Sequence, residues 1–458
     1  MAFTASADVI RLKNGRTIWA DEVRQINDRV EYDIGDDTYA IPKSAVDRID
    51  SGGIPPAYSH SGDNPALPEL TPPPPSFSHE AEVAQKVIHD GKVDEDALTK
   101  LDQQADAELA ATGYFLAGKK ELDSGNYPQA KRYLEAALRF QPDNATLLIY
   151  YAAALLRTGN ESEALSYAER GARADRNSAD ALAMLGFAQF ANDHTPDAIG
   201  SWKKSLALRP DAKVSAYLAK AQREANAELK YSLRESTHFT LHFEGRQMPP
   251  GLPQDVLATL EQHWDELADD LGYSPPNNII VTLYSEDAFI DVTRAPAWTS
   301  AVNDGKLRIP VSGLTTVTPE LSRVLKHELT HSFVAQMSAS RCPTWLQEGI
   351  AQMEESKSTA GVGRQLALLF ADDHEIPLNM LEGNFMGFSS AEAMLAYSES
   401  LAAVEYMRDT YGINDISRIL VQLQQGSSTE AAMRSVIHCD YRRLQAEMAD
   451  WLKEKYGE

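Results

Sequence analysis

Three alanines at a fixed spacing constrain the fold of this chain more than any other feature. Ala130, Ala164 and Ala198 are each separated by 34 residues, and each follows a turn-forming pair by a few positions. Those pairs are Gly125-Asn126, Gly159-Asn160 and Asn192-Asp193. A period of this length indicates helix–turn–helix units that bury their apolar faces by stacking on one another. We therefore predict a helical region over 80–227 that contains an α-helical solenoid from about residue 111.

The period resembles that of tetratricopeptide repeats. A second set of small residues keeps the same spacing on the preceding helices: Gly118, Ala152 and Gly186. Pro142 and Pro210 close the first and third repeats, and Arg176 stands in place of proline in the second. The resemblance implies a concave face that binds a protein segment. A rigid spacer is the alternative role for the array.

A second motif indicates a metal site. His327 and His331 enclose Glu328 in a His-Glu-x-x-His run, after a helix start with Thr318 as N-cap and Pro319 at the first position. On a helix, residues four positions apart share a face, so both imidazoles can point at one ion. A further helix is expected after Pro343-Thr344, and it carries Glu348. A carboxylate there can complete an N,N,O zinc site and leave a fourth position for water.

These residues resemble the gluzincin metallopeptidases, and in particular the peptidase MA-like proteins that in bacteria often follow tetratricopeptide repeats. The likeness rests on His-Glu-Leu-Thr-His and on residues 343–351, which are similar to the family's Pro-x-Trp-Leu-x-Glu-Gly-x-Ala segment. It extends, more faintly, over a domain that we place at 229–456. The resemblance implies His327, His331 and Glu348 as ligands of Zn²⁺ and Glu328 as general base.

The chain departs from the family pattern in two places. Sixteen residues separate His331 from Glu348, two fewer than in the related aminopeptidases. The Gly-Ala-Met-Glu-Asn segment, by which those aminopeptidases hold a free substrate amine, is not found upstream. Exopeptidase specificity is therefore not implied.

Hydrolysis also needs a donor for the oxyanion that develops on the attacked carbonyl. Tyr397 is the candidate, because similar families place a tyrosine at the corresponding stage of the helical C-terminal part. The alternative is that Tyr397 only packs, with its hydroxyl as a polar tip. His374 and His438 are weaker candidates for the same role.

Two histidines and two cysteines elsewhere in the chain could be functional, but each pair also has a purely structural explanation. His238 and His242 lie in an alternating segment that is typical of a strand, where solvent-facing polar positions explain the pattern without a metal. Cys342 and Cys439 could form a disulfide between the active-site loop and the last helices. Two unpaired buried thiols are the alternative.

The C-terminal part has a mixed α and β start. Strands are predicted at 238–243 and 279–284, and a helix is predicted at 252–271. The segment 306–311 is predicted as a further strand, with Pro310 marking an edge or an end. By the resemblance, this last strand borders the cleft and pairs with an extended peptide. Residues 372–390 are irregular and are expected to line the cleft. The alternative is that Phe385, Met386 and Phe388 anchor this segment to the core.

The N-terminal part is of a different kind. Residues 8–50 contain alternating runs and an Asn14-Gly15 turn, which predict a small all-β meander or barrel. Residues 51–78 are rich in proline, glycine and serine and predict an extended linker. The units on either side of this linker are expected to move independently.

Charge and hydropathy exclude some functions. The chain of 458 residues has 67 acidic and 43 basic residues and a formal charge of −24, which argues against unaided binding to nucleic acid or to an anionic membrane. No apolar run reaches eighteen residues, so we expect no membrane span. Ala5-Ser6-Ala7 has the small-x-small form of a signal-peptidase site, although the usual preceding regions are missing. We expect export to the periplasm or the exterior, with a cytoplasmic location as the alternative.

Together these features predict a multidomain protein with a small all-β unit, a tetratricopeptide solenoid and an α+β gluzincin-like metallopeptidase domain. The expected reaction is hydrolysis of peptide bonds by a zinc-activated water, with the repeats binding a substrate or partner. One alternative is a catalytically idle fold that serves as a repeat scaffold. Another is a zinc hydrolase that acts on a non-peptide amide.

Overall fold

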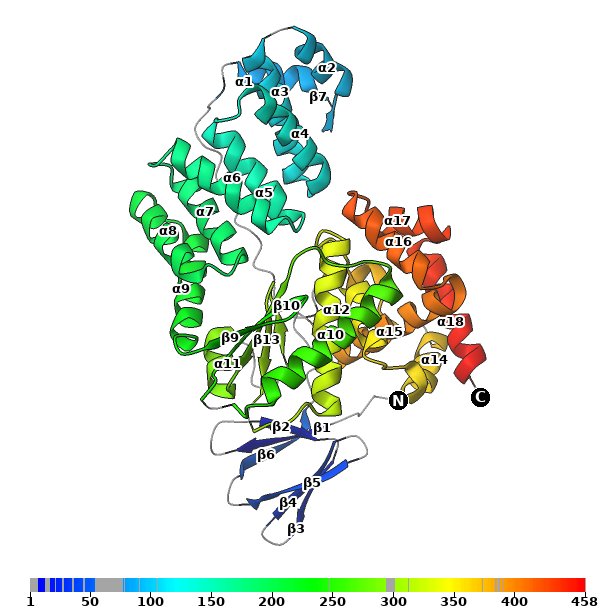
Figure 1. Ribbon diagram of the computed structural model, residues 1–458. Coiled ribbons are helices and arrows are strands. Elements are labelled where there is room, and N and C mark those ends of the chain that lie inside the picture. Colours follow the sequence, from blue (N-terminus) through cyan, green and yellow to red (C-terminus); the bar gives the residue numbers. More distant parts are fainter. Residues whose placement is uncertain are drawn as a thin grey trace.

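The computed structural model describes residues 7–12, 17–20, 22–26, 29–34, 37–43, 46–53, 77, 79–89, 91–104, 106–246, 248–293, 301–311, 313–372, 374–383, 385, 388 and 390–457. They form three parts: an N-terminal β unit, a helical array and a C-terminal unit of mixed α and β structure (Figure 1). The multidomain fold class predicted from the sequence is confirmed.

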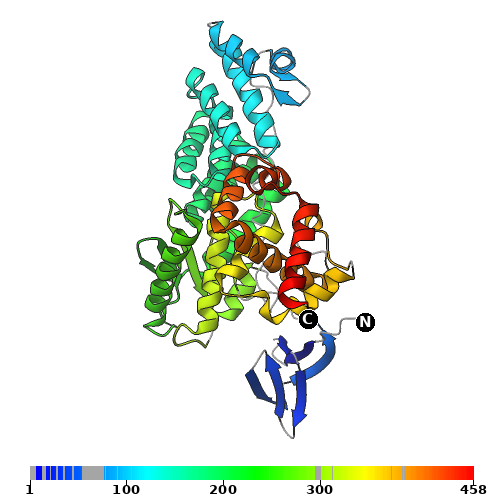
Figure 2. The ribbon, with the colours of Figure 1, turned by 90° about the vertical axis from the view of Figure 1, so that its right-hand side faces the viewer.

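The N-terminal unit consists of six short strands. They are β1 (Ala7–Leu12), β2 (Thr17–Ala20), β3 (Glu22–Ile26), β4 (Arg29–Ile34), β5 (Asp37–Pro42) and β6 (Val46–Gly53). Two antiparallel three-stranded sheets result, with the orders β2-β1-β6 and β3-β4-β5. Ile10 and Val30 are fully buried between the sheets. Figure 2 shows this unit at the end of the molecule opposite to the first helices of the array.

The structure bears on two predictions for the N-terminal part. The Asn14-Gly15 turn lies outside the described residues, although β1 and β2 pair around it as a hairpin would. The predicted linker 51–78 begins too early, because β6 continues to Gly53 and pairs with β1. Most of the remaining linker lies outside the described residues.

The helical array contains nine helices in the described residues. They are α1 (Glu80–Val87), α2 (Glu95–Gln103), α3 (Ala107–Asp123), α4 (Tyr127–Phe140), α5 (Ala145–Arg157), α6 (Glu161–Ala174), α7 (Ala179–Ala191), α8 (Thr195–Leu208) and α9 (Ala212–Ala227). A short ribbon of β7 (Ile88–His89) and β8 (Lys92–Val93), which the sequence did not predict, lies between α1 and α2. The pairs α3–α4, α5–α6 and α7–α8 are the three repeats.

The repeated small residues lie where paired helices approach each other. Ala130, Ala164 and Ala198 are fully buried. A Cβ atom added at Gly186 would lie 2.4 Å from Nε1 of Trp202, so only glycine fits beside that indole. The 34-residue spacing is therefore a packing requirement, as predicted.

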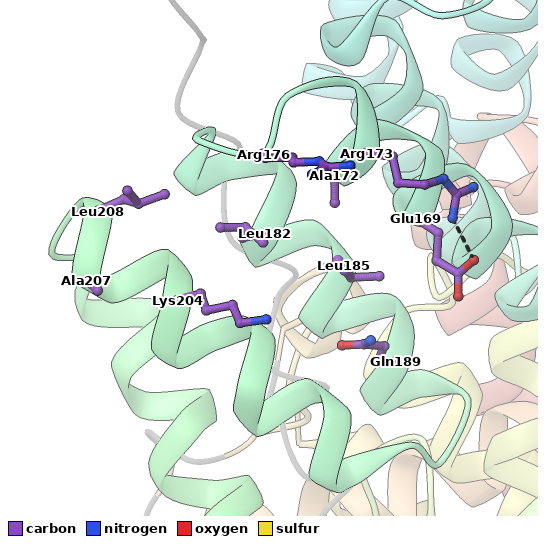
Figure 3. A pocket seen from close by; sticks show the side chains of 10 residues that line it. All are labelled: Glu169, Ala172, Arg173, Arg176, Leu182, Leu185, Gln189, Lys204, Ala207 and Leu208. Carbon is purple, nitrogen blue, oxygen red and sulfur yellow. Dashed lines mark hydrogen bonds and ion pairs between the residues drawn. The ribbon is translucent and has the colours of Figure 1, made fainter.

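A hollow of about 660 Å³ opens on the array between α6, α7 and α8 (Figure 3). Leu182 and Leu185 of α7 contribute apolar surface to it. Arg173, Arg176 and Lys204 lie around its edge, and Glu169 pairs with Arg173 at 3.4 Å. The hollow thus combines aliphatic and cationic surface in a chain whose overall charge is negative.

The C-terminal unit begins with a five-stranded sheet. The strands are β9 (Ser232–Glu235), β10 (Phe239–Phe243), β11 (Ile279–Tyr284), β12 (Val302–Asn303) and β13 (Leu307–Pro310), in the order β12-β13-β11-β10-β9. β10, β11 and β13 are parallel, and the outer strands β9 and β12 are antiparallel to their neighbours. Helices α10 (Leu252–Leu271) and α12 (Pro319–Met337) share one core with the sheet, and α11 (Glu286–Thr293) packs with Tyr284 and Val302 in another.

The predicted strand in the segment 306–311 is present as β13, and of the two alternatives for Pro310 the end of the strand is confirmed. The expectation that this strand pairs with an extended peptide is wrong. β13 is paired on both sides, with β11 and β12, and Pro310 stands at its last position. Within the described part of the chain, the outer strand on this side is β12. A strand of two residues is too short to carry an alternating pattern, so β12 could not be predicted from the sequence.

The remainder of the C-terminal unit is helical. It contains α13 (Thr344–Glu354), η2 (Thr359–Gly361), α14 (Gly363–Ala371), η3 (Leu378–Leu381), α15 (Ser390–Tyr411), α16 (Ile413–Gln424), α17 (Thr429–Ile437) and α18 (Tyr441–Tyr456). Cys342 and Cys439 are free thiols, so the hypothesis of a disulfide is wrong. The Cys439 thiol instead donates to the Asp440 carbonyl, 3.4 Å away.

The array contacts the C-terminal unit through the turns that join the two helices of each repeat. The contacts are Arg341 to the Gly125 carbonyl, Asn277 Nδ2 to the Gly159 carbonyl at 3.1 Å, and Lys306 Nζ to Asp193 at 2.7 Å. Successive repeats therefore present equivalent turns to one neighbouring surface. The array is attached along its length by these turns, in addition to the chain connection after α9.

Among the helices that the structure describes, none has the length and apolar character needed to cross a bilayer. The prediction of export rests on residues that are mostly outside the described part and stays a prediction.

Candidate metal centre

Helix α12 brings the two histidines of the motif together. Its start is fixed by Thr318, whose side chain accepts a hydrogen bond from the Leu321 amide at 3.2 Å, and Pro319 occupies the first turn. His327 and His331 follow one turn apart, and both are almost fully buried. Their Nε2 atoms lie 3.1 Å from each other. The helix therefore directs two imidazole nitrogens to one point, as the spacing predicted.

Helix α13 supplies a carboxylate to the same point. Oε2 of Glu348 lies 3.6 Å from Nε2 of His327, and Oε1 lies 3.8 Å from Nε2 of His331. The three donor atoms all lie within 4.8 Å of one another, and no other group of three such residues is found in the described part of the chain. The structure thus brings together the three residues predicted as ligands.

Gly349 explains how α13 can reach this position. A Cβ atom at Gly349 would lie 2.3 Å from the Ser400 carbonyl oxygen and 2.5 Å from Cγ2 of Val404, both on α15. Because backbone atoms of a long helix cannot easily move aside, α13 and α15 can pack this closely only at a glycine. The glycine after Glu348 therefore has a steric role at the centre.

Two further residues hold the outer nitrogens of the imidazoles. Oε1 of Glu355 lies 3.1 Å from Nδ1 of His327, and the side-chain amide of Gln347 lies 3.1 Å from Nδ1 of His331. Partners on Nδ1 fix the orientation of each ring and so direct its Nε2 atom toward Glu348. Sequence reasoning missed both residues. Glu355 had a usable signal, since it lies seven residues after Glu348 and thus on the same helical face.

Burial of these groups shifts their pKa values strongly. Burial opposes the charged form of His327, but hydrogen bonds with Glu348 and Glu355 raise the pKa of His327 to about 10. Burial and the neighbouring His327 hold the pKa of His331 well below its usual range. Burial, together with Glu348 and Glu355, raises the pKa of Glu328 to about 8, although His327 opposes this shift.

Glu328 itself is 1% exposed, and its Oε2 atom has no hydrogen-bond partner among the described residues. A buried carboxylate oxygen without a partner is costly unless something else binds it. The backbone carbonyl of Glu328 is engaged separately, by Nδ2 of Asn303 at 2.8 Å. The Glu328 carboxylate is therefore available as a hydrogen-bond acceptor beside the histidines, while Asn303 fixes the backbone of Glu328.

Tyr397 lies on α15 near the centre. Burial raises the pKa of Tyr397 above its usual range, and the charges of Glu348 and Glu328 raise it further, so the hydroxyl lies within electrostatic reach of both carboxylates. Its ring packs edge-on against Phe385 at 5.3 Å, and its carbonyl accepts from Gln352 at 3.0 Å.

The weaker candidates for the tyrosine's role, His374 and His438, are both exposed.

The other histidine pair has structural partners. Nδ1 of His238 lies 2.7 Å from Glu261, and Nε2 of His242 lies 2.8 Å from Asp193 in the array. Each ring is thus held by a different carboxylate, and the two do not form a metal site. The alternating segment is a strand, as predicted, but its histidines are partly buried against carboxylates and do not simply face solvent.

The donor set fits zinc. Tetrahedral coordination with bonds of ~2.0–2.1 Å places two donor atoms about 3.3 Å apart. The observed separations of 3.1, 3.6 and 3.8 Å lie near this value. Two imidazoles and one carboxylate are also a ligand set of catalytic zinc sites.

Comparisons with known proteins agree with this arrangement. The family model of the Peptidase MA superfamily matches residues 259–454, and a tetratricopeptide repeat model matches residues 121–186. The chain therefore carries a Peptidase MA superfamily domain behind tetratricopeptide repeats. No curated protein matches the chain.

Several solved structures resemble parts or most of the chain at low sequence identity. The first tetratricopeptide domain of Spaghetti (RPAP3), bound to an HSP90 peptide, is 22% identical, with 25% of this chain and 93% of that chain covered and a TM-score of 0.25. MamA of AMB-1 is 23% identical, with 28% and 78% covered and a TM-score of 0.25. A mutant Thermobaculum terrenum O-GlcNAc transferase is 10% identical, with 86% and 100% covered and a TM-score of 0.26.

Proposed function

We propose that this protein is a zinc-dependent metallopeptidase whose tetratricopeptide repeats bind a protein substrate or partner. The observation that carries the proposal is the cluster of His327, His331 and Glu348, with donor atoms within 4.8 Å of one another, beside the unpartnered carboxylate oxygen of Glu328. The Peptidase MA superfamily match over 259–454 supports a peptidase fold for this part.

In this proposal His327, His331 and Glu348 hold Zn²⁺. The ion supplies a Lewis acid that lowers the pKa of water and polarises a carbonyl group. Oε2 of Glu328 accepts the proton of the attacking water, since it lies on the same helix turn and is not committed to another hydrogen bond. The Tyr397 hydroxyl donates to the oxyanion that develops on the carbonyl.

In this proposal the strand that pairs with an extended substrate is β12 and not the segment 306–311. It is the outer strand next to α12, and within the described residues one of its sides is not paired with another strand. An extended peptide can add to such an edge through backbone hydrogen bonds. The site would then receive a peptide bond from an unfolded segment.

The repeats would bring such segments to the enzyme. A tetratricopeptide array offers a concave face to a protein segment. The hollow between α6, α7 and α8 adds aliphatic surface from Leu182 and Leu185 with Arg176 and Lys204 at its edge, which suits an acidic segment with apolar side chains (Figure 3). Reversing the charge at Arg176 and Lys204 is expected to weaken binding of that kind of segment.

The experiment that tests the proposal combines metal analysis with hydrolysis. Elemental analysis is expected to find about one zinc per wild-type chain and little in Glu348→Ala, because a three-ligand site loses most of its affinity with one ligand. Glu328→Gln is expected to keep its zinc and to lose roughly 100-fold or more of the hydrolysis of casein, since it lacks the general base.

The outcome also separates the alternatives. Zinc binding without hydrolysis of casein or of a mixed peptide library would favour the idle scaffold. Hydrolysis of small non-peptide amides, without peptide cleavage, would favour a zinc hydrolase of a different class. Absence of metal in the wild-type protein after zinc has been supplied would overturn the metallopeptidase proposal.

A further inference from the structure

The side chain of Asn303 ties the outer strand β12 to the helix of the candidate metal centre. Its Nδ2 atom lies 2.8 Å from the carbonyl oxygen of Glu328 and 2.7 Å from the hydroxyl of Ser332. Its Oδ1 atom accepts from the Gly305 amide at 3.3 Å, which directs the NH₂ group toward the helix. Because Glu328 and Ser332 directly follow His327 and His331, one amide spans the helical turn that carries both imidazoles.

The residues that follow Asn303 are anchored in buried charge. Arg308 is fully buried, and its guanidinium binds Asp304 at 3.0 Å and Glu224 at 2.8 Å. Nζ of Lys306, 4% exposed, lies 2.6 Å from Glu224. Each charge of this group therefore has an oppositely charged partner at hydrogen-bond distance.

Glu224 belongs to α9, the last helix of the array, and it is fully buried. Lys220, one turn earlier on α9, lies 2.6 Å from Asp304, the residue next to Asn303. Two side chains of α9 thus hold the hairpin of β12 and β13 from the side of the array. Glu224 bridges Lys306 and Arg308, and Asp304 bridges Arg308 and Lys220, so loss of either carboxylate would take a partner from two cations at once. This bridging makes the arrangement rigid.

We infer that Asn303 is a positioning residue of the metal centre, and that the last helix of the repeat array supports it through the buried ion pairs. The inference rests on the proposed zinc function and adds a part of the site that lies outside the motif. Asn303 fixes the position of α12 relative to the sheet, so that the imidazoles of His327 and His331 lie beside the carboxylate of Glu348. The array is then a structural component of the centre as well as a binding surface.

The test measures zinc affinity, by competition with a chelating indicator, in full-length Asn303→Ala and Asn303→Asp. The aspartate has the same shape but lacks the NH₂ donors, so both variants are expected to bind zinc at least roughly tenfold more weakly, as for other residues that orient ligands. The visible absorption bands of the Co²⁺-substituted protein are expected to shift in both, because the ligand geometry changes.

Asn277→Ala is the matched control. It removes the same kind of side chain, which donates to the Gly159 carbonyl at 3.1 Å and to Glu161 at 2.6 Å and has no hydrogen bond to α12 within the described part of the chain. Its zinc affinity is expected to stay within twofold of wild type. If both Asn303 variants kept the wild-type affinity and cobalt spectrum, as the control does, the inference would be overturned.

A second readout works without metal. Hydrogen exchange of residues 327–334 is expected to be faster in Asn303→Ala than in Asn277→Ala, since only the former loses its bond to α12. If wild-type protein bound no metal, the zinc proposal would fail, and this comparison would still decide the role of Asn303. Equal exchange in the two variants would reject it.

Discussion

The carboxylate of Glu355 holds Nδ1 of His327 at 3.1 Å, while Nε2 of the same ring faces Glu348 at 3.6 Å. One imidazole is thus fixed between two carboxylates, that of Glu348 on α13 and that of Glu355, which directly follows the last residue of α13. Glu355 also binds Lys357 at 2.8 Å, which keeps its own side chain in place. The ring cannot rotate without losing a charged partner.

Glu355→Gln is therefore expected to weaken zinc binding by about 10–100-fold, because a neutral amide orients and polarises the imidazole less strongly. Zinc affinity of the purified protein checks this. Glu354→Gln is the control, because that neighbouring carboxylate faces Lys326 at 3.6 Å and not an imidazole. Equal zinc affinity in the two variants would show that Glu355 does not support the ligand.

Gly349→Ala is expected to destabilise the protein by about 1–3 kcal/mol, because its methyl group would overlap the Ser400 carbonyl at 2.3 Å. The clash outweighs the gain that alanine normally gives inside a helix. Urea unfolding measures the change. Gly361→Ala is the control, since a Cβ there meets no atom within 4 Å. An equally stable Gly349→Ala would mean that α13 and α15 can separate freely.

Much of the fold could be predicted from local patterns, because long helices carry their own signals. The N-cap at Thr318, the apolar spacing of 252–271 and the repeated alanines predicted elements that the structure contains. The ligand set could be predicted because four-residue spacing places side chains on one face.

The missed features depend on contacts between distant segments. Asn303 and Glu328 are 25 residues apart, and Lys306 and Glu224 are 82 apart, so neither pair has a local pattern. The strand β12 is too short for periodicity. The placement of the array against the C-terminal unit follows from such pairs and could not be read from helical propensity.

Acid is expected to weaken the contact between the array and the C-terminal unit at Asp193. Burial opposes its charge, but hydrogen bonds and charge interactions with His242 and Lys306 lower the pKa of Asp193 to about 2. Because the folded pKa lies below the ordinary value of about 3.9, the stabilisation is present above about pH 4 and is lost as the pH falls toward 2. Its size is about 2 kcal/mol.

Urea unfolding between pH 6 and pH 2 measures this loss. Asp193→Asn is expected to show a shallower decline than wild type over the acid range, because it has no carboxyl to protonate. Asp197→Asn, which changes an exposed residue of α8, is expected to follow the wild-type curve. A wild-type decline no steeper than that of Asp193→Asn would contradict the role of this contact.

Glu224→Gln is expected to destabilise the protein by about 3–5 kcal/mol, because it removes the negative charge between two buried cations. Arg308 is fully buried and Lys306 is 4% exposed, so neither can regain water without opening the interface. Glu169→Gln is the control for losing a carboxylate partner of arginine, since the Glu169–Arg173 pair is largely exposed and contributes less than about 1 kcal/mol.

A double variant separates charge balance from packing at this interface. Lys306→Gln added to Glu224→Gln removes one of the two cations that have lost the Glu224 carboxylate, so the combined loss is expected to be smaller than the sum of the two single losses. Thermal and urea unfolding of the four proteins give this difference. Strictly additive losses would mean that Glu224 and Lys306 act independently, and the hairpin after Asn303 would then be held by packing and not by the buried ion pairs.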